Sequence, residues 1–199
     1  MAVEKTRAAI VDVARQLFAR KGIDETTMHD ISVAAGKGRR TLYTYFNSKE
    51  DIYDAVIEAE LERMSREMAD VAAQKMTPEE KLVAVIYSHL TSIKEAVRRN
   101  GNMRAQFFRD SWRVSIVRQR FDANERRLLT QILNEGEQQG YFEIEDVPLT
   151  VNIIHYCLRG LEVPYIYGRL STPQNPHGAR AAVARIIHRA IGNTVRIEN

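Results

Sequence analysis

The chain has a single cysteine, Cys157, among 199 residues, which excludes a disulfide bond within it. No apolar run approaches the roughly 18 residues that a membrane-spanning helix needs, so the sequence predicts no membrane partner. The stretch MAVEKTRAAIVDVARQLF meets charged residues early and lacks the long apolar core of a signal peptide. Together these absences predict a protein of a reducing, cytoplasmic compartment.

Catalytic and metal-binding patterns are missing as well. The sequence has no G-x-S-x-G motif and no phosphate-binding P-loop. His89, His155 and His188 are not spaced as ligand pairs at i, i+3 or i, i+4, so we expect core or interface histidines. Cys157 is expected to be a small buried side chain. We therefore predict no catalytic residue, no metal site, no cofactor and no enzymatic activity.

The overall charge says little about partners, but its distribution does. Hydrophobic residues make up 44% of the chain, the net charge is +3 and the pI is about 9.0, which is too mild to indicate a nucleic-acid binder. Residues 37–49, however, carry Lys37, Arg39, Arg40 and Lys49 and no acid. This local patch is the feature that needs an explanation.

Apolar residues recur at spacings of three and four along most of the chain, which predicts helices and no strand. Gly22 and Gly36 supply helix ends, and TMHD and SKED each place an acid three residues after an N-cap. Pro78 and Pro148 open helices, and Pro164 is expected to kink or break one late. The predicted fold is all-α, with helices at 3–21, 27–36, 39–45, 48–71, 78–100, 102–115, 118–139, 148–167 and 179–191.

The first three helices contain a helix-turn-helix arrangement, because two short helices meet at a tight glycine-containing link and the second is cationic. Arg39 and Arg40 lie at the start of the second helix, where arginine can bind guanine through two hydrogen bonds. Tyr43 and Tyr45 offer hydroxyls to phosphates or rings to thymine methyls, although core packing is an alternative for each. The patch therefore predicts contact with double-stranded DNA.

Residues 26–56 resemble the DNA-binding domain of the TetR family of transcriptional repressors. The family pattern is roughly T-T/S-x-x-D-I-A-x-x-A-G-V-S-x-G-T-L-Y-x-Y-F-x-S-K-E. Lys37-Gly38 replaces the usual Val-Ser, and Arg40 replaces a glycine, so we expect arginine side chains to take over from backbone amides and the operator to differ. The matching residues are Thr26, Thr27, Asp30, Ile31, Ala35, Gly36, Thr41, Leu42, Tyr43, Tyr45, Phe46, Ser48, Lys49 and Glu50.

The resemblance implies a helix-turn-helix domain at residues 1–47 and a helical effector-binding and dimerisation domain at 48–199. A long helix from Ser48 would join the two. Leu42 and Phe46 would be core residues. The implied DNA-binding residues are Thr27, Lys37, Gly38, Arg39, Arg40, Thr41, Tyr43, Thr44, Tyr45 and Lys49.

The middle of the chain is basic, with seven arginines between Arg98 and Arg120 opposed only by Asp110. One hypothesis is a pocket for an anionic effector, lined by Phe107, Phe108, Arg109, Trp112 and Arg113. The alternative is a helix surface paired with acids elsewhere, over an aromatic core.

A single helix-turn-helix contacts few base pairs, so two copies are expected to bind two half-sites. The resemblance implies a homodimer through the last two helices, with Ile153, Ile154, Leu158, Leu161, Val183 and Ile187 at the interface. We therefore predict a dimeric regulator, most simply a repressor, that an unidentified small molecule releases from operator DNA. The alternative is a helical ligand-binding or adaptor protein whose basic patch binds an acidic protein.

Overall fold

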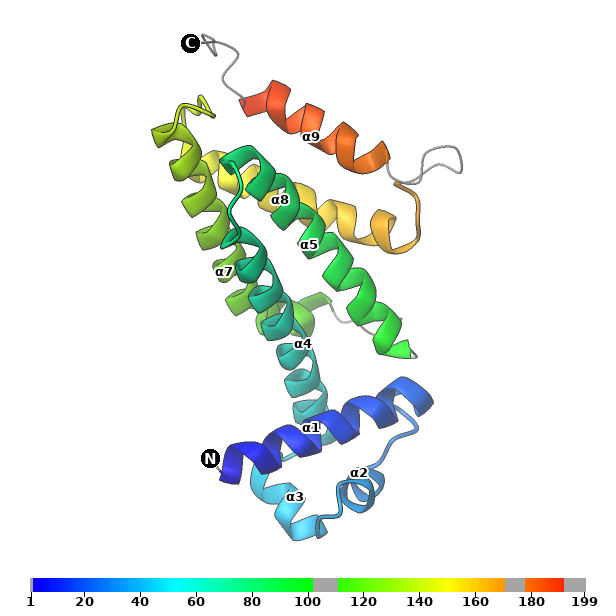
Figure 1. The fold of residues 1–199 in the computed structure, drawn as a ribbon. Coiled ribbons are helices and arrows are strands. Elements are labelled where there is room, and N and C mark those ends of the chain that lie inside the picture. Colours follow the sequence, from blue (N-terminus) through cyan, green and yellow to red (C-terminus); the bar gives the residue numbers. More distant parts are fainter. Residues whose placement is uncertain (1, 102–110, 171–177, 192–199) are drawn as a thin grey trace. The chain divides into compact units, whose positions relative to one another are not determined.

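The computed structural model describes residues 2–101, 111–170 and 178–191. This part of the chain forms eight α-helices and no β-strand, which confirms the all-α prediction (Figure 1). The chain divides into two compact units, one of residues 1–62 with 95–119 and one of residues 63–94 with 120–199. Among the described residues, no helix is long and apolar enough to cross a membrane.

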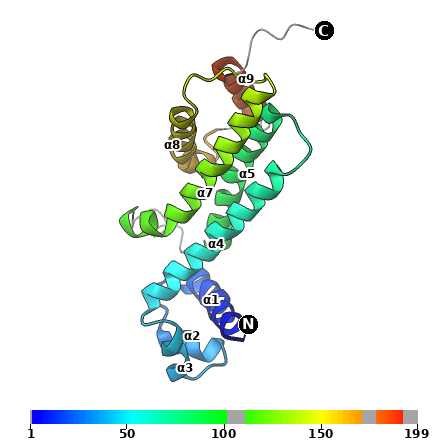
Figure 2. The same cartoon turned by 90° about the vertical axis from the view of Figure 1, so that its left-hand side faces the viewer.

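The first unit holds three N-terminal helices, α1 (Ala2–Lys21), α2 (Met28–Ala34) and α3 (Arg39–Tyr45). Their predicted ranges were nearly the same, and the first two helices end near glycines with positive φ, Gly22 at 84° and Gly36 at 61°. Figures 1 and 2 show α1 lying across α2 and α3. Apolar side chains from all three helices are buried in the core of this unit, among them Ile10, Ala14, Phe18, Ile31 and Leu42.

Two long helices follow, α4 (Lys49–Ala72) and α5 (Pro78–Arg99). Both begin at a hydroxyl that accepts the backbone N–H of an acid three residues on. At α5 that acid accepts the N–H of the N-cap, which completes a capping box, whereas at α4 it accepts the N–H of Asn47. At α4 the pair is Ser48 and Asp51, and at α5 it is Thr77 and Glu80. The boundary between the two units falls within α4, within α5 and within the helix after α5.

That next helix, α7 (Ser111–Gln138), begins earlier than predicted. Residues 111–115 were assigned to a separate short piece at 102–115, but they are the first turns of α7, and 102–110 lie outside the described residues. No glycine or proline occurs between residues 111 and 135, so nothing ends a helix there. Near its far end, a Cβ atom on Gly136 would overlap the ring of Phe142, which packs over this glycine.

The last two described helices are α8 (Val147–Ile166) and α9 (Gly178–Ile191). Asp146 caps α8 by accepting the backbone N–H of Leu149 at 2.9 Å, and a proline occupies its first turn as predicted. Pro164 lies inside α8, which ends two residues later, in agreement with the predicted late break. None of the described α9 side chains, from residue 181 to 191, is buried.

A buried polar cluster joins α5, α7 and α8 in the second unit, where these helices lie side by side (Figures 1 and 2). Glu125 of α7 contacts His89 Nδ1 through one carboxylate oxygen and His155 Nδ1 through the other, each at 2.5 Å. His89 Nε2 also lies 3.1 Å from Glu162 of α8. All four side chains are buried, so we call them the His–Glu cluster and regard it as the polar centre of this unit.

The cluster moves two pKa values in opposite directions. Burial alone would lower the pKa of His89, but hydrogen bonds and negative charge from Glu125 and Glu162 raise it to about 9. Burial alone would raise the pKa of Glu125, but hydrogen bonds from His155 and His89 lower it to about 2. His89 is therefore an imidazolium and Glu125 a carboxylate near neutral pH.

These contacts confirm that His89 and His155 are satisfied core histidines, whereas His188 is exposed and lies 2.7 Å from Glu79. The expectation for Cys157 was wrong, because it is exposed. His155 and Leu158 take the buried positions of this turn of α8, so Cys157 falls on the outer side. Within the described residues, no group of three or more His, Cys, Asp or Glu is placed to hold a metal ion.

The His–Glu cluster predicts a defined pH dependence of stability. His89 stabilises the fold fully below its unfolded pKa of 6.5 and loses this contribution as the pH rises through about 9. Glu125 contributes above its unfolded pKa of 4.5 and loses its contribution as the pH falls through about 2. Thermal unfolding should therefore show a decreasing melting temperature between pH 6.5 and 9.

Replacing one partner tests the same cluster. Glu125→Gln should lower the free energy of unfolding at pH 6 by about 3 kcal/mol, because it leaves a buried imidazolium without its main anion. The same variant should flatten the decline between pH 6.5 and 9. Glu137→Gln, on the same helix but outside the cluster, is the control. An unchanged pH profile in Glu125→Gln would contradict the assignment.

Candidate nucleic-acid interface

The candidate interface begins at the first turn of α2. Thr27 is its N-cap, and its hydroxyl accepts the backbone N–H of Asp30 at 3.1 Å. The Asp30 carboxylate in turn accepts the Thr27 N–H at 3.0 Å, and hydrogen bonding from the Thr27 backbone, and next from its side chain, holds the pKa of Asp30 below its ordinary value. The predicted capping box is thus confirmed with Asp in place of Glu. It fixes where α2 starts and leaves Thr27 at the surface.

A tight link joins α2 to α3. Gly36 has a φ of 61°, which a glycine adopts without strain, and the backbone N–H of Lys37 donates to the Ser32 carbonyl at 2.9 Å. Gly38 then caps α3 from an extended conformation, with no side-chain hydrogen bond to the helix. Because Gly38 has no side chain, the first turn of α3 is uncovered.

Two buried side chains set the rotation of α3 about its axis. Leu42 has no exposed surface, and Phe46, directly after the helix, is 4% exposed. Since residues four apart lie on one helix face, this anchoring turns the opposite face toward solvent. Arg40, Tyr43 and Thr44 occupy that outer face, and Arg39 begins the helix; all four are exposed.

The cations of this face are available to a ligand. Among the described residues, no hydrogen bond or ion pair holds the side chains of Lys37, Arg39 or Arg40. Thr44 differs, because its hydroxyl donates to the Arg40 carbonyl at 3.0 Å. A short helix whose outward side chains are unpaired arginines can present guanidinium groups to base edges and phosphates at once.

Of the ten predicted DNA-binding residues, the structure brings eight to the exposed surface of the first unit, and Tyr45 and Lys49 are half-buried. Lys49 Nζ donates to the Asp24 carbonyl at 3.3 Å, which the sequence did not indicate. Arg7 lies over the Phe46 ring at 5.1 Å, another contact that only the fold creates. Both contacts tie α1 and the α1–α2 link to the chain around α3.

The side chains of the predicted effector residues all fall outside the part of the chain that the structure describes. Phe107, Phe108 and Arg109 lie outside the described residues. Trp112 and Arg113 belong to the first turn of α7, and their side chains are not among those described.

The predicted dimer residues have mixed exposure. Ile153 is 55% exposed and Leu158 is buried, while Ile154, Leu161, Val183 and Ile187 are half-buried. A more exposed set on α8 and at its C-cap, Tyr167, was missed: Leu149, Ile153, Tyr156, Val163 and Tyr167 follow spacings of three, four and seven. These five residues form one apolar stripe, here called the α8 stripe, and Gly160 occupies its only gap. On α9, Ile186 is 66% exposed.

Comparisons with known proteins agree with this geometry. The family model for bacterial regulatory proteins of the tetR family matches residues 10–56. The HTH-type transcriptional repressor KstR2 of Mycobacterium tuberculosis is 26% identical over 159 residues, which cover 79% of this chain and 78% of that protein.

Two solved structures share the fold. A transcriptional regulator of the TetR/AcrR family from Thermobifida fusca is 20% identical and superposes with a TM-score of 0.69 over 92% of this chain and 97% of that one. A protein from Saccharomonospora viridis, solved in complex with choline, is 17% identical, with a TM-score of 0.67 over 95% and 98% of the two chains. The likeness extends beyond the N-terminal helices to the larger helical part.

The anchoring of α3 can be tested by shortening its buried residue. Leu42→Ala should lower the free energy of unfolding of the N-terminal helices by about 3 kcal/mol, because it removes a fully buried side chain and leaves a cavity. Thr41→Ala, at the exposed neighbouring position, should change it by less than about 0.5 kcal/mol. Urea denaturation followed by circular dichroism measures both. Equal effects of the two substitutions would contradict the orientation of α3.

Proposed function

The chain belongs to the TetR family of transcriptional regulators, and we propose that it is a dimeric repressor that a small-molecule effector releases from operator DNA. The observation that carries the DNA-binding part is the outward face of α3, where exposed, unpaired Arg39 and Arg40 stand over a helix anchored by Leu42. The related KstR2 is named a repressor, which supports that sign of regulation.

In this proposal α3 enters the major groove and its flanks contact the backbone. Arg39 and Arg40 bind base edges with Tyr43 and Thr44 beside them, and Arg is the side chain best suited to guanine. Thr27 and Lys49 contact phosphates on either side. Lys37, Gly38, Thr41 and Tyr45 complete the surface, and residues 1–47 form the DNA-binding domain.

The α8 stripe supports the dimer. A row of exposed apolar side chains along one helix is unfavourable in water, and such a row marks an interface. α9 adds Ile186 and has no fully buried side chain of its own in the described range, so much of its apolar surface is left for a partner. We propose that α8 and α9 of two copies pack together around a two-fold axis.

Regulation then follows from linkage. Two DNA-binding domains hold their half-sites only at the right separation, roughly 34–36 Å apart. An effector bound by residues 48–199 favours a dimer with a different separation of the two domains. The factor by which it lowers operator affinity is set by how much more tightly it binds that state than the DNA-binding state. The choline complex of the Saccharomonospora viridis protein supports a small-molecule site in this fold. Such a regulator works in the cytoplasm.

The DNA-binding proposal is tested by selecting duplexes from a random pool with the full chain and measuring binding across a salt series. We expect an enriched site with two half-sites, whose affinity falls steeply as salt rises. Arg39→Ala/Arg40→Ala should weaken binding to that site by about a hundredfold, since each bidentate base contact contributes about 1–3 kcal/mol.

Arg66→Ala is the matched control, because Arg66 is an exposed arginine on α4 in the second unit. It should leave operator affinity nearly unchanged. A selection that enriches no site, or equal losses in the α3 and α4 variants, would sink the proposed role of α3.

The dimer is tested by placing charge in the α8 stripe. Ile153→Glu/Tyr156→Glu should convert a dimer at micromolar concentration to a monomer, because an interface cannot bury unpaired carboxylates. Ile116→Glu alters an isoleucine that is 47% exposed on α7 and should remain dimeric. Sedimentation velocity distinguishes the species. A monomeric wild-type chain at micromolar concentration would refute the dimer.

A further inference from the structure

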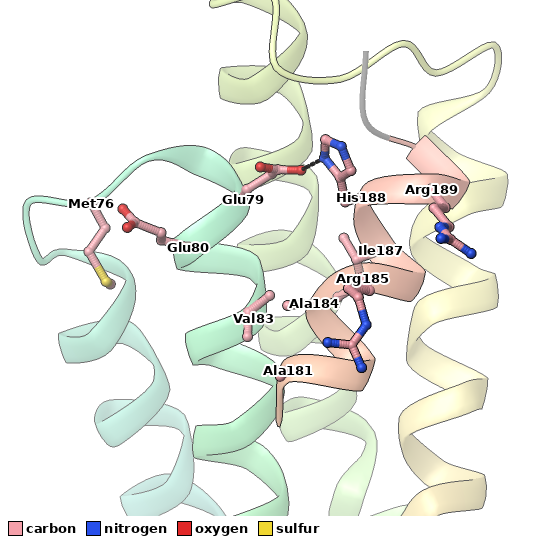
Figure 3. Close-up of a pocket in the computed structure, with 10 residues that line it drawn as sticks. All are labelled: Met76, Glu79, Glu80, Val83, Ala181, Ala184, Arg185, Ile187, His188 and Arg189. Carbon is pink, nitrogen blue, oxygen red and sulfur yellow. Dashed lines mark hydrogen bonds and ion pairs between the residues drawn. The ribbon is translucent and has the colours of Figure 1, made fainter. Parts of the chain in front are cut away.

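A groove runs between α9 and the start of α5, within the second unit (Figure 3). Its volume is about 910 Å³, which is in the size range of small-molecule sites. Met76 and Val83 line it from the α5 side, and Ala181, Ala184 and Ile187 line it from α9. The floor is therefore apolar, and the small alanine side chains leave the space open.

The polar atoms around this groove are not equivalent. Glu79 contacts His188 Nδ1 at 2.7 Å across the groove, as Figure 3 shows. Glu80 accepts the Thr77 N–H at 2.9 Å and the Thr77 hydroxyl at 3.1 Å, and these bonds hold its pKa below the ordinary value. Both acids that line the groove are thus engaged with the protein itself.

The arginines of the groove are different. Arg185 and Arg189 are exposed, lie one turn apart on α9, and make no ion pair or hydrogen bond within the described part of the chain. A cation in the last turn of a helix is favourable in itself, which would account for Arg189. It does not account for Arg185, nor for an apolar floor beside both guanidinium groups.

We propose that this groove binds a soluble single-chain amphiphile with a carboxylate head. The apolar chain lies on Met76, Val83 and Ala184, and the carboxylate accepts hydrogen bonds from Arg185 and Arg189, which suit planar anions. Ala181 and Arg189 are eight positions apart on α9, a rise of about 12 Å along the helix. That length suits an acyl chain of medium size.

Binding in the groove does not depend on DNA recognition, but its regulatory meaning rests on the proposed function. α9 has no buried side chain in its described range, carries the exposed Ile186 and belongs to the proposed dimer interface. A ligand that fills the space between α9 and α5 therefore contacts a helix of the proposed dimer interface. This is the kind of differential contact that shifts a dimer between two arrangements.

Isothermal titration of the full chain with dodecanoate, below its micelle concentration, tests the site. We expect saturable binding of one molecule per chain. Arg185→Gln/Arg189→Gln should weaken it about tenfold, because two charge-assisted hydrogen bonds are lost at an exposed site. Ala184→Trp should also weaken it, because the indole ring fills the floor. Arg127→Gln, which removes an exposed arginine of α7, should have no effect.

Dodecyltrimethylammonium is the second probe, because it keeps the chain and reverses the charge of the head. It should bind at least about tenfold more weakly than dodecanoate. Equal binding of the two probes, unchanged binding in both groove variants, or no dodecanoate binding at all would overturn the proposal. If dodecanoate binds as expected but leaves operator affinity unchanged, the site stands and its regulatory role is refuted.

Discussion

The burial of Leu42 and Phe46 is the constraint on which the DNA-facing surface depends. A helix of seven residues is too short to be stable alone in water, so α3 exists only because it packs against the other N-terminal helices. The same packing removes its freedom to rotate about its axis. With Leu42 inward, Arg40, Tyr43 and Thr44 face outward, and Arg39 is exposed in the first turn. The same buried contact thus supports both stability and DNA recognition. Leu42 is not expected to contact DNA, but its burial determines which residues of α3 can.

Most helices could be predicted because their ends carry local signals. Gly22, Gly36 and the capping residue Thr27 each act through the backbone next to them, so their meaning is present in the sequence. The start of α7 was missed for the opposite reason. Aromatic and basic residues near 102–115 suggested a separate piece, but no glycine or proline separates residues 111–115 from the rest of α7. Without a breaker, helix propagation is cheaper than a new start.

Contacts between distant residues could not be predicted from spacing. Glu125 meets His89 and His155, residues 36 and 30 positions away, and nothing local announces that pairing. The histidines were correctly assigned to the core, because they lie among apolar residues, but the carboxylate that makes their burial tolerable was not found. For the same reason, Cys157 was placed on the wrong side of α8. One residue of helix turns a side chain by about 100°, so a small error in the inward face exchanges buried and exposed positions.

Net charge is a poor guide to where this chain presents charge, and internal pairing explains why. Although the net charge is only +3, two surfaces carry arginines that are free to bind an anionic ligand, and the reason differs between the two surfaces. Around α3 no acid occurs between Lys37 and Lys49, so the arginines lack local partners. Beside α9 the acids are present, but Glu79 contacts His188 and Glu80 accepts hydrogen bonds from Thr77, so within the described residues no carboxylate pairs with Arg185. Around α3 the sequence alone shows that the arginines lack acidic neighbours. Beside α9 only the fold shows it, because the fold determines which acids already have partners.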